Sequence, residues 1–484
     1  MKKISILLLY AALFILAASC TKNISDLNND PKNPLSVPSG SLLVNAEKNL
    51  SDALNSTSNG VNPFRVLAQS WTENTYVSEA RYILSASDAP SGWWNTLYAS
   101  GTSSVLNSLV AAKVAATKDV TDPAVLRNDL IITDILEVYA YSLLVNTYGN
   151  VPYSQAFKDS IPFPAYDDAK TVYYDLLTRL DTAIAGLNTS AAGWGKYDQL
   201  YSGNIGQWKK FAATLKLKLS LVVADVDPST AAQKVQEAVA TGVFQSNNDN
   251  ALINYQASPT GNTNPAYQAF ITRHDYSPAD IIVDSLLAWN DPRLPLYLTQ
   301  YNGGYSGGVP GAGNGYVKFS QFSSQWLNPT FPGDILDYAE TEFLLAEAAE
   351  RGINVGGTAE SHYDNGITAS ILYWGGSATD AANYLLQPAV GYSTATGNWK
   401  QKIGYQKWIA FANRGWDAWT EIRRLGYPDL DNVNPPVGAN GNLPRRFYYP
   451  NNEQTSNPVN WAAAVKAVTG GTTDAVSYNL WWNK

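Results

Sequence analysis

The sequence predicts a mainly α-helical fold, in which a helical body carries long, elaborated loops and a few short strands. Apolar residues recur at helical spacing through most of the chain. The segment 227–242 also begins with Asp-Pro and ends on Gly242, which is typical of a helix with defined ends. Strand-like alternation is scarce and is clearest at 316–322 (YVKFSQF). Together these observations favour packed helices over a large sheet.

The first 20 residues are typical of a secreted chain. Lys2 and Lys3 precede an almost wholly apolar run at 4–18, and the run ends in small residues directly before Cys20. The run is shorter than the ~20 residues of a spanning helix, and no later stretch is expected to be apolar enough for one. Cys20 is the only cysteine of the 484 residues, and its context resembles a bacterial lipobox. We expect residues 1–19 to be removed and Cys20 to be acylated; the alternative is an ordinary signal peptide with an incidental cysteine.

The remaining chain is expected to have two parts. Residues 20–39 are polar and rich in Asn, Pro and Ser, and we interpret them as a tether or extended arm. Residues 40–484 are expected to form a single α-helical domain. The formal net charge is −8, which argues against a nucleic-acid partner. Because no second cysteine is present, stability must come from core packing rather than from disulfides.

Several helices can be placed in order along the body. An apolar stripe covers 132–144 and ends at the sequence YGNVP, and a second stripe covers 208–219. The segments 334–352 and 357–374 are expected to form an antiparallel helix pair. Paired helices of this kind suggest a helical-repeat scaffold, although no clean repeat period is visible in the sequence.

The segment 405–428 is predicted to be a helix that bends at Gly415 and ends at Gly426, with Pro428 beyond it. Its arginines, with those of a later segment, are expected to form buried or interhelical ion pairs: Arg423, Arg424, Arg445 and Arg446. Glu347 is expected to pair with Arg351 at i+4 rather than to be catalytic.

Three long stretches are predicted to be irregular, at 244–278, 299–332 and 427–484. The second of these contains the glycine-rich sequence NGGYSGGVPGAGNGY at 302–316. Loops of this length without structure of their own are usually functional. We therefore expect the functional residues to lie in loops on the helical body.

No motif in the sequence requires an enzyme. His274 and His362 stand alone, without the spacing of a zinc protease, and no serine or cysteine motif lies beside a histidine. The glycines of 303–315 lack the Lys-Ser/Thr of a phosphate-binding loop. No metal site or cofactor is expected. A glycosidase with two carboxylates stays open, because its acids need no fixed spacing in sequence.

Several longer motifs resemble the SusD/RagB family of outer-membrane lipoproteins, in particular the SusD-like 2 branch. The resemblance covers nearly the whole chain after the signal segment, and its marks include LNNDPKNP (27–34), NTYGNVPYSQAF (146–157), SGNIGQWKKFAATLKLKL (202–219) and LPRRFYYPNNEQ (443–454). It implies helical pairs of tetratricopeptide type with loops elaborated on them. It also implies a lipid-anchored, non-enzymatic protein at the outside of the outer membrane, which binds a glycan nutrient and delivers it to a SusC-like TonB-dependent transporter. A peptide ligand is the alternative within the same family.

Ligand residues do not follow from the family motifs, so we predict them from position and chemistry. Aromatic rings stack on sugar rings, whereas amide and guanidinium groups bind hydroxyls. In the first loop region these residues are Trp71, Asn74, Tyr76, Arg81 and Trp93, and in the glycine-rich region they are Tyr305, Tyr316 and Trp326. The alternative is that such rings only fill the core, and for Trp94, Leu97 and Tyr98, at a predicted helix start, we favour it.

Overall fold

The computed structural model describes residues 37–98 and 104–483. The predicted signal segment, Cys20 and nearly all of the predicted tether lie outside these ranges. The first described helix, α3, begins at Ser39, where the segment interpreted as a tether ends.

Helices dominate the described ranges, so the prediction of a mainly α-helical fold is confirmed. In the first half they are α3 (Ser39–Asn55), α4 (Phe64–Leu67), α5 (Ala89–Tyr98), α6 (Val105–Asp119), α7 (Pro123–Tyr148), α8 (Ala169–Gly186), α9 (Ile205–Val222) and α10 (Pro228–Thr241). They continue as α11 (Pro265–Thr272), α12 (Asp280–Ala288), α13 (Leu294–Tyr297), α14 (Tyr338–Glu350), α15 (Ala359–Tyr373), α16 (Ala378–Leu385), α17 (Trp399–Ala410), α18 (Gly415–Leu425), α19 (Leu430–Val433), α20 (Asn451–Ser456) and α21 (Pro458–Thr469). Short strands form antiparallel pairs: β1 (Trp71–Glu73) with β5 (Tyr276–Pro278), β2 (Val151–Pro152) with β3 (Tyr166–Asp167), and β4 (Ala251–Ile253) with β6 (Gly333–Leu336).

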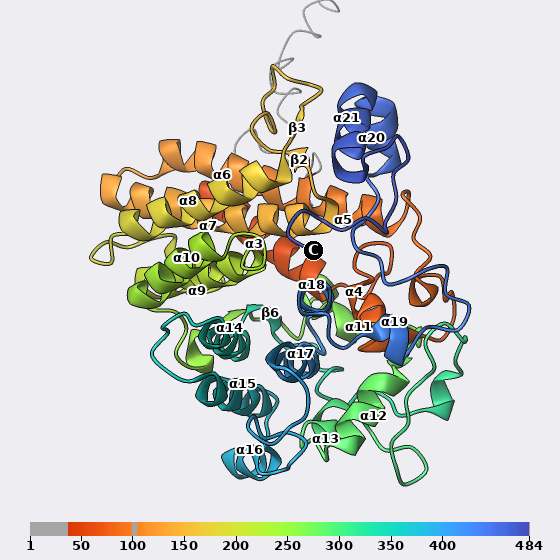
Figure 1. The fold of residues 1–484 in the computed structure, drawn as a ribbon. Coiled ribbons are helices and arrows are strands. Elements are labelled where there is room, and N and C mark those ends of the chain that lie inside the picture. Colours follow the sequence, from red (N-terminus) through yellow and green to blue (C-terminus); the bar gives the residue numbers. More distant parts are fainter. Residues whose placement is uncertain (1–36, 99–103, 484) are drawn as a thin grey trace, which may run out of the picture.

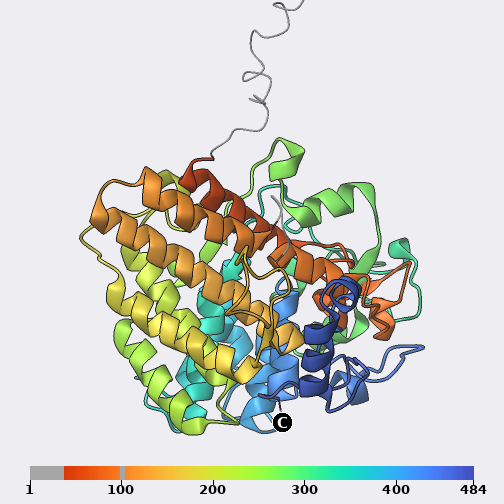
Figure 2. The same ribbon diagram turned by 90° about the horizontal axis from the view of Figure 1, so that it is seen from above.

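Consecutive helices pack against each other in pairs, notably α6 with α7, α9 with α10, and α14 with α15. Only residues 120–122 separate α6 from α7, so the chain must reverse direction between them. Helices α6 to α10 lie together on one side of the molecule, and loops gather on the other (Figures 1 and 2). The helix pair predicted from 334–352 and 357–374 is confirmed as α14 and α15.

Helix α7 packs against both α6 and α8. Asp122 caps it by accepting hydrogen bonds from the N–H groups of Ala124 and Val125, and Pro123 occupies the first turn, where no N–H is needed. Among the described residues, α7 is the one helix long and apolar enough to span a membrane, but 83% of its most apolar window is buried within the protein. The expectation that no later stretch has this composition was therefore wrong, and burial in the core accounts for the apolar character.

The segment 405–428 forms two helices, α17 and α18, rather than one bent helix. The interruption ends at Gly415, which begins α18. A Cβ atom at Gly415 would lie 2.4 Å from the backbone nitrogen of Arg65, so the glycine allows α18 to approach α4 closely. Gly426 ends α18 in the left-handed region at φ 79°, as predicted.

A buried ion-pair cluster joins α14 to α18. Glu347 Oε1 lies 2.9 Å from Arg351 Nε, which confirms the predicted i+4 pair. The two carboxylate oxygens of Glu347 also lie 2.5 Å from the two Nη atoms of Arg424. Arg424 in turn contacts Glu421 Oε2 at 2.6 Å. Glu347 is therefore a structural residue held by two guanidinium groups.

Of the other three arginines predicted to form ion pairs, two do so and one does not. Arg445 pairs with Asp431 at 3.1 Å, and Arg446 pairs with Asp474. Arg423 instead donates to backbone carbonyl oxygens, and no carboxylate in the described part of the chain lies within ion-pair distance of it. Its predicted ion pair was wrong, because the buried guanidinium already donates to the carbonyl oxygens of Asn146 in α7 and of Arg445.

The long segments are only partly irregular. The stretch 427–484 contains α19, α20 and α21, so its prediction as a loop was wrong. The predicted strand at 316–322 was also wrong: a short 3-10 helix, η5 (Tyr316–Lys318), begins it, and Phe322 forms only an isolated bridge to Leu298. No strand runs alongside this segment in the described structure, and Val317 is 73% exposed, so the alternation does not mark a buried strand face. Apart from η5, 299–332 lacks helices and strands in the structure.

Candidate functional site

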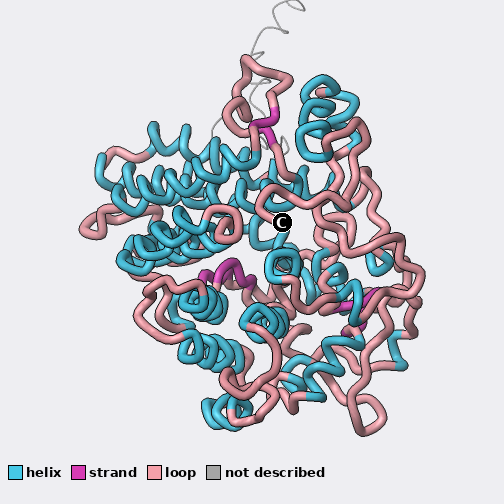
Figure 3. Tube along the Cα trace, in the orientation of Figure 1, coloured by secondary structure: helices cyan, strands magenta, loops and turns pink. Residues whose placement is uncertain are grey.

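Strands β1 and β5 bring two loop regions together that are far apart in sequence. Glu73 of β1 lies opposite Tyr276 of β5. Directly after β1, the backbone N–H of Asn74 donates to the carbonyl of Asp275 at 2.7 Å. In Figure 3 this strand pair lies on the loop-rich side, away from the paired helices.

The glycine-rich segment lies against this strand pair. The Asn314 amide donates to the carbonyl oxygen of Glu73 at 3.0 Å and to that of Val309 at 3.0 Å. A Cβ atom at Gly308 would lie 2.9 Å from the Thr72 side chain, so glycine permits this approach. The two loop regions predicted to supply ligand residues are thus adjacent.

Three of the predicted stacking residues are core residues. Trp71, Trp93 and Trp326 are 2%, 0% and 3% exposed. Trp71 lies among Phe270, Phe322 and Trp326, with ring centroids 4.7 to 5.7 Å from its own, and the Arg65 guanidinium lies 4.8 Å from its ring. No ring face of these tryptophans is free in this structure, so their predicted stacking role is corrected to a packing role. Trp94 and Leu97 of α5 are buried, as expected.

Asn74 and Arg81 hold the loops together. The Asn74 amide donates to the carbonyl of His274 at 2.8 Å and accepts from the Ser277 hydroxyl at 2.9 Å. Arg81 Nε donates to the carbonyl of Gly311 at 2.8 Å. The hydroxyl-binding role predicted for Asn74 is corrected, because both ends of its nearly buried amide are already bonded within the protein.

Tyr76, Tyr316 and Tyr305 keep exposed surface, to different extents. Tyr76 is 75% exposed and has a left-handed backbone at φ 59°, a conformation that is costly for a bulky residue. Tyr316 is half-buried and stacks on the exposed imidazole of His274, with ring centroids 4.2 Å apart and planes at 9°. Tyr305 is half-buried and packs against the core. The role of His274 escaped prediction, because nothing near it in sequence indicates its partner.

A polar groove with a volume of about 530 Å³ lies beside Tyr76. Arg273 and the carboxyl groups of Glu73 and Glu79 also line it. Hydroxyl and amide groups complete its lining, from Thr57, Ser58, Asn59, Thr75 and Ser78. Glu73 and Glu79 are 1% and 7% exposed, so they form the base of the groove rather than its rim.

The two buried carboxyl groups are neighbours, and each affects the pKa of the other. The backbone N–H of Ala80 also donates to Glu73 Oε2 at 2.8 Å. Burial, as the main cause, raises the pKa of Glu73 to about 9 and also raises the pKa of Glu79. Near neutral pH Glu73 therefore holds a proton, and its carboxyl group is neutral.

This arrangement suits binding better than hydrolysis. An exposed ring beside hydroxyl, amide and carboxyl groups matches a polyhydroxylated ligand. Glycosidases instead place two carboxyl groups about 5–10 Å apart on either side of the reacting sugar, whereas Glu73 is only 1% exposed and already accepts a bond from the backbone N–H of Ala80. Among the described residues, no group of three or more His, Cys, Asp or Glu side chains could hold a metal ion.

Comparison with known families decides the classification. A family model, SusD-like and described as starch-binding associating with outer membrane, matches residues 31–450. The chain belongs to the SusD-like family. Proteins of this family are described as binding proteins associated with the outer membrane, and the resemblance stated from the sequence motifs is confirmed. A search of curated proteins returned no match.

Solved SusD-like structures share the fold over nearly the whole chain. A chitin-binding protein is 27% identical, covers 92% of this chain and 100% of its own, and has a TM-score of 0.78. A SusD homolog from Bacteroides uniformis ATCC 8492 is 26% identical, covers 92% and 99%, and has a TM-score of 0.75. A SusD homolog from Bacteroides fragilis NCTC 9343 is 24% identical, covers 93% and 100%, and has a TM-score of 0.79.

Proposed function

We propose that this SusD-like protein binds a glycan in the groove beside Tyr76 and delivers it to a SusC-like TonB-dependent transporter of the outer membrane. One observation carries the proposal: an exposed tyrosine ring lies beside a groove of hydroxyl, amide and carboxyl groups, in a chain of a starch-binding family. Arg273 and Asp275, on either side of His274, line this groove, and the His274 ring stacks on Tyr316.

The chemistry of the groove supports a saccharide. Sugar rings have apolar faces that stack on aromatic rings, and their hydroxyls both donate and accept hydrogen bonds. Tyr76 provides the ring, Arg273 provides a donor, and the hydroxyl and amide groups of the lining provide donors and acceptors. One structural relative is named as chitin-binding, which supports the same ligand class for this chain.

The location and anchoring are part of the same proposal. The basic, apolar and small-residue pattern of residues 1–19 supports removal of a signal peptide, and Cys20 would then carry the lipid. Residues 20–39 would tether the helical domain, 40–484, to the outer face of the outer membrane. We propose no catalytic step and no cofactor.

The test is a calorimetric titration of the purified protein with chitin oligosaccharides, malto-oligosaccharides and a peptide mixture, followed by product analysis. We expect a neutral oligosaccharide to bind without the appearance of new reducing ends. New reducing ends would overturn the proposal in favour of an anchored hydrolase. Binding of peptides alone would replace the glycan with a peptide nutrient.

A further inference from the structure

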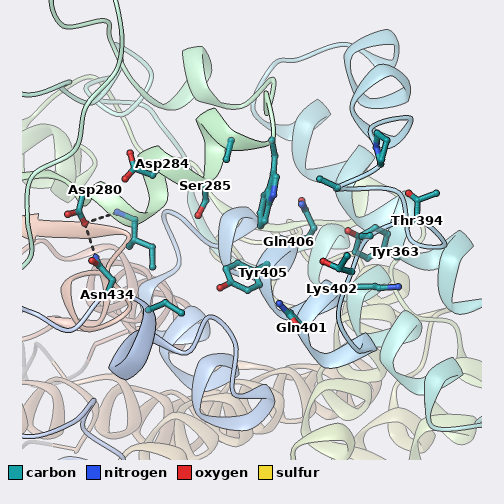
Figure 4. A pocket seen from close by; sticks show the side chains of 18 residues that line it. Asp280, Asp284, Ser285, Tyr363, Thr394, Gln401, Lys402, Tyr405, Gln406 and Asn434 are labelled. Atoms are coloured by element: carbon teal, nitrogen blue, oxygen red, sulfur yellow. Dashed lines mark hydrogen bonds between the residues drawn. The ribbon is translucent and has the colours of Figure 1, made fainter.

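A second cleft lies between α12 and α17, with a volume of about 690 Å³ (Figure 4). It shares no lining residue with the groove beside Tyr76. Tyr276, the first residue of β5, lines the groove. The cleft begins at Asp280, two residues after β5 ends. The cleft is within the size range of small-molecule sites in proteins.

The cleft contains an aromatic corner. Trp289 and Tyr405 are both partly exposed, and their rings meet at 83° with centroids 5.5 Å apart. Tyr405 lies in the middle of the cleft, between the groups that line its two ends (Figure 4). Rings in this arrangement offer faces to a sugar ring or to a cation.

The two ends of the cleft differ in charge. Asp280 and Asp284 lie on one side of Tyr405, and Lys402 lies on the other (Figure 4). Within the described structure, no Lys, Arg or His side chain lies within ion-pair distance of either aspartate. The Lys402 ammonium already donates to the carbonyl of Tyr392 at 2.7 Å. The Lys402 ammonium thus has a hydrogen-bond partner, whereas the two carboxylates at the acidic end face the cleft without a cationic partner.

Asp280 is held in position before any ligand arrives. Its Oδ1 accepts hydrogen bonds from the Asn434 amide at 2.8 Å and from the backbone N–H of Ile281 at 2.7 Å. Burial, followed by smaller effects that include the charge of Asp284, raises the pKa of Asp280. A cation placed between the two carboxylates would offset the cost of burying the Asp280 charge and its repulsion by Asp284.

We propose that this cleft is a second saccharide site, which takes an oligosaccharide with a free amino group. The protonated amine lies between Asp280 and Asp284, and the sugar ring that carries it lies on Tyr405 and Trp289. Gln401 and Thr394, at the far side of the cleft, meet the hydroxyls of the next sugar unit. A neutral or N-acetylated sugar leaves the acidic end without a counter-charge and binds here more weakly.

The test is a calorimetric titration of the full-length chain at pH 6 with a glucosamine tetramer, beside its N-acetylated counterpart and a neutral glucose tetramer. We expect the glucosamine tetramer to bind and the affinity to fall as the amine loses its proton. Asp284→Asn should weaken it about fivefold, since Asp284 is exposed and keeps its shape as Asn. Tyr405→Leu should weaken it about tenfold through loss of the ring.

Asp159→Asn is the matched control, because Asp159 is an exposed aspartate that does not line the cleft. It should leave the affinity unchanged. The proposal is overturned if the glucosamine tetramer does not bind, or if Asp284→Asn and Tyr405→Leu, both shown to be folded by circular dichroism, bind it as the unaltered chain does. Equal binding of the three tetramers, with equal sensitivity to both substitutions, would remove the amine from the proposal.

Discussion

The imidazole of His274 and the phenol ring of Tyr316 lie parallel, at 9°, with their centroids 4.2 Å apart. His274 lies two residues before β5, and Tyr316 is the last residue of the glycine-rich segment 302–316. Burial raises the pKa of the Tyr316 hydroxyl, which therefore stays protonated at physiological pH. The stack joins two loops from distant parts of the sequence, one of which lines the groove through Arg273 and Asp275.

Tyr316→Ala should weaken glycan binding about twofold to tenfold. The substitution removes the ring that holds His274, which lies between the groove-lining residues Arg273 and Asp275, and an aromatic pair contributes about 0.5–1.5 kcal/mol beyond its buried area. Calorimetric titration with the glycan identified in the binding screen measures the change. Tyr478→Ala removes a 41% exposed tyrosine that does not line the groove, and it should bind as the unaltered protein does.

Tyr76→Ala should weaken glycan binding by a similar factor and leave the unfolding temperature unchanged. The side chain is 75% exposed, so it contributes little to the core and offers its ring to a ligand. Phe163→Ala is the control, because Phe163 is 60% exposed and lies in the β2–β3 connection, outside the groove. Unchanged affinity in a folded Tyr76→Ala protein would exclude Tyr76 from the site.

Trp71→Ala should destabilise the protein by about 3–5 kcal/mol, which is the usual cost of removing a large buried aromatic ring. Trp71 is 2% exposed and contacts the rings of Phe322 and Trp326. Chemical denaturation followed by circular dichroism measures the loss. Trp71→Phe, which keeps a ring in the same cavity, should cost less. A stable Trp71→Ala protein with lower glycan affinity would instead restore the ligand role predicted from the sequence.

Glu347→Gln should lower the free energy of unfolding by about 3 kcal/mol. It leaves the buried Arg424 guanidinium with Glu421 as its remaining carboxylate, and breaking a buried pair costs about 3–5 kcal/mol. Lys48→Ala breaks the more exposed Lys48–Asp52 pair and should cost about 1 kcal/mol or less. Equal losses in the two variants would contradict a structural role for the buried cluster.

Stability should fall as the pH rises from about 5 to about 9, in part because of Glu73. Its pKa is about 9 in the folded protein, above the ordinary value of 4.5, so the folded state binds more protons than the unfolded state over this window. Stability contributed by the protonated carboxyl is present at low pH and is lost as the pH approaches 9. Glu73→Gln keeps a neutral side chain of the same shape and should flatten the dependence. Urea unfolding at pH 5, 7 and 9 measures how the free energy of unfolding of both proteins changes with pH. Identical pH dependences would contradict the raised pKa of Glu73.

Local sequence patterns predicted the scaffold well. The spacing that defines α7, and the Asp-Pro and Gly242 that bound α10, act through neighbours one or two helical turns away, so the sequence contains the whole signal. Helix α21 escaped prediction although Pro458 begins it and Gly470 ends it. The polar residues of this segment are only Asn460, Lys466 and Thr469, so the sequence did contain the signal for this helix.

The candidate site was predicted by region but not by residue. Trp71 has polar neighbours along the chain, which suggested an exposed ring, but Phe322 and Trp326 reach it from a distant loop and cover it. His274 and Tyr316 likewise come from separate loops of the sequence. Exposure depends on such long-range contacts, and one sequence does not reveal which loops meet.

The loops around the groove are fastened by Asn74, Arg81 and Asn314, largely through bonds to main-chain carbonyl oxygens. Such bonds do not depend on the identity of the residue that supplies the carbonyl. The outward-facing side chains, Tyr76 among them, are therefore free to be replaced without loss of the loop framework. Over evolutionary time this separation lets a lineage change the nutrient that it captures by single substitutions at the rim, while selection for stability acts on a different set of residues.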